Sequence, residues 1–73
     1  MLEVLETETD QTRHIRQIMN LAWLTEIQYL EHHGNSVGIA RNASISLEKE
    51  GHDRNLVATL GTQCYLYVRG EIF

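Results

Sequence analysis

The chain has 73 residues, with ten acidic and six basic side chains and a formal charge of −4. A chain of this length has room for one small domain, which buries only about 60% of the surface that it exposes when unfolded. The negative charge argues against broad binding to nucleic-acid phosphates, which needs a cationic surface. With 42% hydrophobic and 22% charged residues, the composition is that of a folded domain rather than a disordered tail.

The cysteine content and the first residues suggest a compartment. One cysteine, Cys64, can form neither an internal disulfide nor a Cys-x-x-Cys pair, which favours a reducing, cytoplasmic setting. The opening segment MLEVLETETD is acidic and lacks the basic stretch and apolar run of a secretory signal. We expect no membrane span, and we expect residues 1–73 to form one domain.

The first half of the chain predicts one strand and one helix. Residues 1–6 alternate loosely and predict a short edge strand. Residues 11–33 contain no glycine or proline and predict a helix about 35 Å long, with Asp10 as its N-cap and Gly34 as its left-handed C-cap. One broad sector of this helix is apolar and is expected to lie on the core. It contains Ile15, Ile18, Met19, Ala22, Trp23, Ile27, Tyr29 and Leu30.

In the second half, hydrophobic residues alternate with a period of two and predict strands. Residues 43–48, 56–60 and 62–73 are the predicted strands, with a hairpin loop at 50–53, a break at Gly61 and a weaker strand signal at 37–40. The predicted fold class is therefore α+β, with one long N-terminal helix packed on a three- to four-stranded antiparallel meander.

Two surfaces are predicted to meet a protein partner. Leu21 and Leu24 lie on the helix side that the sheet would leave uncovered, although scattered surface leucines are common. The outward face of the last predicted strand combines aromatic and arginine side chains, which are enriched in interfaces. The same side chains could pair across strands or stack on single-stranded bases. They are Tyr65, Tyr67, Arg69 and Phe73.

Two residues of the predicted core, Glu26 and Cys64, have ionisable side chains. Glu26 falls inside the apolar sector of the helix, and a buried carboxylate needs a partner. We expect it to lie at the rim or to pair with Arg41, Arg54 or Arg69, with contact to a second subunit or a ligand as the alternative. Cys64 falls on the apolar face of the last strand and is expected to be an inert core residue.

The potential metal ligands have no recognised spacing. Adjacent histidines on a helix point about 100° apart, so His32 and His33 are expected to cap the helix end rather than to share an ion. The chain lacks a G-x-S-x-G elbow and a Gly-Lys-Ser/Thr phosphate loop. We therefore predict no catalytic residue, no metal site and no cofactor. The full set of potential ligands is His14, His32, His33, His52, Asp53 and Cys64.

These observations predict a small, non-enzymatic binding or regulatory protein that acts through protein contacts, as a homodimer. One alternative is a nucleic-acid accessory module in which arginines act with the strand aromatics, although the acidic balance argues against it. Another is a small metal-dependent enzyme that uses His52, Asp53 and a histidine of the helix end. The arginines of the first alternative are Arg13, Arg16, Arg41, Arg54 and Arg69.

Overall fold

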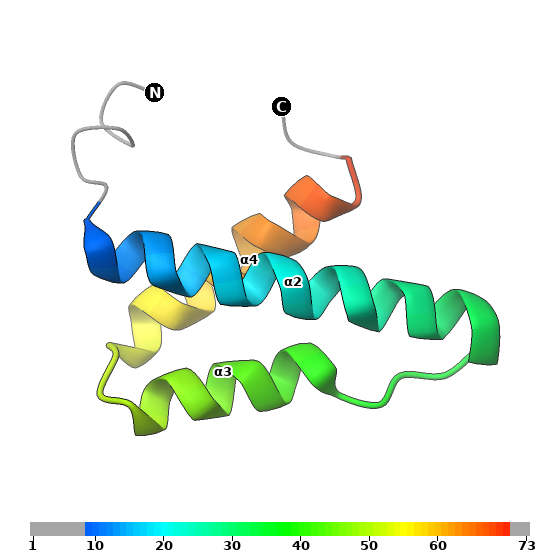
Figure 1. Ribbon diagram of the computed structural model, residues 1–73, viewed down its shortest axis with the longest axis horizontal. Coiled ribbons are helices and arrows are strands. Elements are labelled where there is room, and N and C mark those ends of the chain that lie inside the picture. Colours follow the sequence, from blue (N-terminus) through cyan, green and yellow to red (C-terminus); the bar gives the residue numbers. More distant parts are fainter. Residues whose placement is uncertain (1–8, 71–73) are drawn as a thin grey trace.

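The structure, a computed structural model, describes residues 9–70, which form three α-helices joined by short loops (Figure 1). The helices are α2 (Asp10–His33), α3 (Ile39–Lys49) and α4 (Arg54–Val68). Helix α2 spans the long dimension of the molecule, α3 lies beside it, and α4 crosses behind it (Figure 1). Both shorter helices pack against α2 and also against each other.

The α+β fold class predicted from the sequence is wrong, because residues 9–70 contain no strand and form a small all-helical domain. Residues 43–48 belong to α3, and residues 56–60 and 62–68 belong to the continuous helix α4. Residues 37–40 are loop and the first turn of α3. The predicted strand at residues 1–6 and the end of the predicted strand at 71–73 lie outside the described residues.

The burial pattern of α3 explains the first error. Ala40 and Leu47 are buried and Ala43 and Ser44 are half-buried between them, which is the i, i+3, i+4, i+7 pattern of a helix face. Three of these four side chains are small, so they do not stand out as apolar positions. Ile45 and Leu47 do stand out, and their spacing of two residues favours a strand although Ile45 is 42% exposed.

The second error, the two strands predicted at residues 56–60 and 62–73, has a similar cause in α4. Its buried residues are Val57, Leu60, Gly61 and Cys64, again at i, i+3, i+4 and i+7. Gly61 therefore lies inside the helix, where its small size permits close packing, rather than at a break between two strands. Asp53 begins α4 as its N-cap and accepts hydrogen bonds from the amides of Asn55 (2.7 Å) and Leu56 (3.1 Å).

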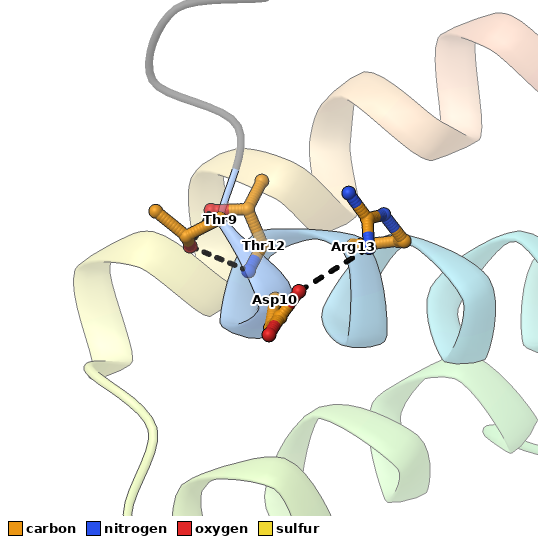
Figure 2. Close-up of polar contacts among 4 residues, drawn as sticks. All are labelled: Thr9, Asp10, Thr12 and Arg13. Carbon is orange, nitrogen blue, oxygen red and sulfur yellow. Dashed lines mark hydrogen bonds and ion pairs between the residues drawn. The ribbon is translucent and has the colours of Figure 1, made fainter.

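Helix α2 confirms the predicted helix over residues 11–33, with one difference at its start. The N-cap is Thr9, whose hydroxyl accepts a hydrogen bond from the Thr12 amide at 3.1 Å, and Asp10 is the first helical residue (Figure 2). Asp10 pairs with Arg13 at 3.2 Å, one turn along. Gly34 ends the helix with φ of 76°, as predicted. No helix within residues 9–70 is both long and apolar enough to cross a membrane.

One core joins the three helices. The indole of Trp23 packs against it and donates a hydrogen bond to the Gly61 carbonyl oxygen at 3.0 Å, which links α2 to the middle of α4. The predicted core position of Cys64 is confirmed. The buried hydrophobic residues are Ile15, Met19, Ala22, Ala40, Leu47, Val57, Leu60 and Cys64.

Gly61 should tolerate a methyl group but not a larger side chain. A Cβ atom at this position would lie 3.3 Å from the flexible methyl end of Met19, and alanine favours a helix by about 1 kcal/mol over glycine. We expect Gly61→Ala to change the free energy of unfolding by less than about 1 kcal/mol and Gly61→Leu to lower it by about 1–3 kcal/mol through overpacking. Urea unfolding measures both, with Ala58→Leu, at an exposed position of α4, as the control. A Gly61→Leu variant as stable as the control would contradict the buried position of Gly61.

Candidate functional site

An uncharged face of α2 points away from the core. Leu21 is 67% exposed and Leu24 is 46% exposed, and the exposed side chains of Gln17 and Gln28 flank them. We call these four residues the leucine face. Between residues 17 and 30 the only charged side chain is that of Glu26, which is buried. The predicted exposure of both leucines is confirmed, and their role in partner binding stays a prediction.

The aromatic residues do not form the shared strand face that the sequence suggested. Tyr65 is half-buried and packs on Trp23 with ring centroids 4.5 Å apart, and its hydroxyl accepts a hydrogen bond from Arg69 at 2.6 Å. Tyr67 is 63% exposed and lies about 200° around α4 from Tyr65. Tyr65 therefore packs against α2, and Phe73 lies outside the described residues. Partner contact at Tyr65, Tyr67, Arg69 or Phe73 stays a prediction.

Glu26 is buried, with 2% of its surface exposed, and it caps the start of α3. Its Oε2 atom accepts hydrogen bonds from the Ser36 hydroxyl (2.7 Å) and from the amides of Val37 (3.0 Å) and Gly38 (3.2 Å). Its Oε1 atom accepts one from the Ala40 amide at 3.1 Å. The partners are thus a hydroxyl and three amides rather than an arginine, and the predicted rim position is wrong.

This arrangement supplies a cap that the local sequence of α3 lacks. Gly38 is the N-cap residue of α3 and has no side chain to accept a hydrogen bond. The first amides of a helix need acceptors and carry partial positive charge, so a carboxylate is favoured there. The hydrogen bond from Ser36 and those from the three amides lower the pKa of Glu26 from 4.5 to about 2, although burial acts in the opposite direction.

A hollow of about 610 Å³ lies between α2 and the start of α3, over the Glu26 carboxylate. Because both oxygens of Glu26 already accept hydrogen bonds, the carboxylate has little capacity left for a substrate or a proton. The thiol of Cys64 is also unreactive, because burial raises its pKa and keeps it protonated. The residues that line the hollow are Trp23, Glu26, Ser36, Val37, Gly38, Ala40, Arg41, Asn42 and Ile45.

The helix arrangement brings together a group of potential metal ligands. His14 lies near the start of α2, and Glu50 and His52 lie in the loop between α3 and α4. Glu50 Oε1 is 3.5 Å from Nε2 of His14 and 3.5 Å from Nε2 of His52. The side-chain amide of Gln11 lies 3.0 Å from Nδ1 of His52. We call His14, Glu50 and His52 the histidine cluster.

This cluster differs from the one that the sequence suggested. His32 and His33 are exposed in the last turn of α2, as predicted. The ring of His33 packs on that of Tyr29, with ring centroids 4.2 Å apart. The carboxylate of Asp53 accepts hydrogen bonds at the start of α4. The histidine that meets His52 is His14, and their separation along the chain gave no signal that the two would meet.

Comparisons with known proteins add no assignment. No family model, no curated protein and no solved structure gives a significant match to the chain. The functional proposals for this chain therefore depend on its own surfaces: the leucine face and the histidine cluster.

Proposed function

We propose that the chain is a small, non-enzymatic binding or regulatory protein of the cytoplasm, which acts through protein contacts and forms a homodimer through the leucine face. The observation that carries the proposal is the exposure of Leu21 and Leu24 on an uncharged part of α2. Two buried groups with catalytic potential, Glu26 and Cys64, support the non-enzymatic part, because one is saturated with hydrogen bonds and the other has a raised pKa.

The spacing of the leucine face suits contact with a second helix. Gln17, Leu21, Leu24 and Gln28 follow one another at intervals of four, three and four residues, which is the spacing of the a and d positions of a coiled-coil seam. Two such helices would place the leucines at the centre and the glutamines, which can hydrogen-bond to each other, at both ends.

The charge distribution favours a second copy of the chain as the partner. Each chain carries a formal charge of −4, so most orientations of two copies bring like charges together. The leucine face avoids that repulsion because it is uncharged. Two leucines per copy are a small apolar surface, so we expect a reversible dimer whose population rises with concentration.

The test replaces a central leucine by a charged residue. Leu24→Asp places two negative charges in the proposed seam and should shift the monomer–dimer equilibrium to monomer, by at least about tenfold in Kd, the equivalent of about 1.4 kcal/mol. Sedimentation equilibrium over a range of concentrations measures the shift. Leu21→Asp should have the same effect, and circular dichroism should show an unchanged helix content because both leucines are exposed.

Ile45→Asp is the matched control, since Ile45 is 42% exposed but lies on α3. This variant should associate like the wild type. A wild type that stays monomeric at every concentration, or a Leu24→Asp variant that associates as well as Ile45→Asp, would contradict the proposal.

The nucleic-acid alternative has less support than the homodimer. It combined arginines from several parts of the chain with the aromatic side chains of a predicted strand, and residues 9–70 contain no strand. Arg13 pairs with Asp10, and Arg69 donates a hydrogen bond to Tyr65. No surface of the described residues favours this alternative over the leucine face.

A further inference from the structure

We propose that the histidine cluster, His14, Glu50 and His52, binds a divalent transition-metal ion, with Zn²⁺ as the expected species. One ligand atom from each of the three side chains lies within 4.8 Å of the other two. Two imidazole nitrogens and a carboxylate oxygen form a donor set that zinc accepts. The proposal is tested separately from the homodimer, because none of its three ligands belongs to the leucine face, although His14 lies on α2 one turn before Gln17.

The two distances from Glu50 to the histidines fit ligands of one ion better than they fit direct hydrogen bonds. Two atoms bound to one tetrahedral zinc at about 2.0–2.1 Å lie about 3.3–3.4 Å apart. Each Glu50 to histidine distance is 3.5 Å, close to the zinc-bound separation, whereas the ligand atoms of the two histidines lie within 4.8 Å of each other and would have to approach when the ion binds. Hydrogen bonds between nitrogen and oxygen are usually about 2.7–3.2 Å long, so the carboxylate is not closely engaged by either ring.

The partial burial and neighbours of His52 supply the orientation that a metal ligand needs. The His52 side chain is 18% exposed, compared with 47% for His14 and 54% for Glu50. Gln11 Nε2 lies 3.0 Å from Nδ1 of His52, on the opposite side of the ring from Glu50. Zinc binding through Nε2 of His52 requires the Gln11 amide to rotate by 180°, so that its oxygen accepts a hydrogen bond from Nδ1–H, as second-layer partners of metal-bound histidines do.

The ion would join parts of the chain that are distant in sequence. His14 belongs to the second turn of α2, whereas Glu50 and His52 belong to the loop that ends α3 and precedes α4. A bound ion would therefore fix this loop against α2. Because the ligands come together only in the folded chain, binding would stabilise the fold, as any ligand that prefers the native state does. Three protein ligands leave a fourth position for water or for a ligand atom from another molecule.

Zinc titration of the chelator-treated, full-length protein tests the proposal. Isothermal titration calorimetry should show one Zn²⁺ per chain for the wild type, and added Zn²⁺ should raise the melting temperature. His14→Ala and His52→Ala should each weaken binding by at least about tenfold and remove the shift in melting temperature. Gln11→Ala should weaken binding by about 10–100-fold while leaving all three ligands in place.

The double variant His32→Ala/His33→Ala is the matched control, because it removes two exposed histidines outside the cluster. It should bind Zn²⁺ as the wild type does. NMR spectra of the wild type add a readout that does not depend on any variant: Zn²⁺ should shift the ring signals of His14 and His52 and leave those of His32 and His33 in place. Absence of binding to the wild type, or a loss of binding confined to the double variant, would overturn the proposal.

Discussion

Replacing Glu26 by glutamine is expected to lower the free energy of unfolding by about 3 kcal/mol, a large part of the total stability of a 73-residue domain. The carboxylate accepts four hydrogen bonds at the buried start of α3, from Ser36, Val37, Gly38 and Ala40. Glutamine removes the negative charge and places an amide group where two acceptor oxygens stood. At least one buried donor then loses its partner, and each such loss costs about 1–3 kcal/mol.

The pH dependence of stability gives a second measure of the same interaction. The pKa of Glu26 is about 2 in the folded protein and 4.5 as its ordinary value, so folding favours the ionised carboxylate. The contribution of this ionisation to the free energy of unfolding is fully present above about pH 4.5 and is lost as the pH falls through 2. At about 1.4 kcal/mol per pKa unit, it amounts to about 3 kcal/mol. The free energy of unfolding of the wild type should therefore decrease as the pH is lowered from about 4.5 to 2, while that of the Glu26→Gln variant should change less.

Urea unfolding at a series of pH values measures both effects. Glu31→Gln is the matched control, since Glu31 is an exposed carboxylate on the same helix, and it should change stability by no more than about 0.5 kcal/mol. If Glu26→Gln is too unstable to fold, the acid titration of the wild type still tests the cap. Equal stabilities of the two glutamine variants at pH 7 would show that Glu26 does not cap α3.

Truncation of Leu47 to alanine is expected to lower the free energy of unfolding by about 2–5 kcal/mol. Leu47 is fully buried between the helices, so its removal leaves a cavity and loses apolar contacts. Ile45→Ala should cost less than about 1 kcal/mol, because Ile45 is 42% exposed. The two residues are only two positions apart, so the comparison tests the secondary structure as well as the core.

A strand at residues 43–48 would place both side chains on one face, and the two alanine variants would then lose similar stability. In a helix the two side chains point about 200° apart, so only the Leu47 variant should lose much stability. Urea unfolding of the two variants and the wild type distinguishes these cases, and similar losses for both would contradict the helix α3.

The candidate sites differ in how far the sequence could predict them. Leu21 and Leu24 were predictable as exposed, because they lie opposite the apolar sector of a helix that has clear ends. The histidine cluster was not, since His14 and His52 meet only when α3 returns along α2 and brings the following loop to the start of α2. Glu26 was recognisable as an unusual residue in an apolar sector, but its partners come from the next loop and helix.

The sequence by itself determined α2, from its unbroken run of helix-forming residues to the glycine that ends it, because capping and amphipathic spacing are local properties. It also predicted that Cys64 is buried, although from the alternation of a strand where the structure has helix α4. The tertiary structure alone decided that the second half is helical. In α3 and α4 the small residues Ala40 and Gly61 are core positions, and they are recognised as such only when α2 packs against them. Hydrophobicity is a weak signal where close packing of small side chains, rather than their size, buries a helix face.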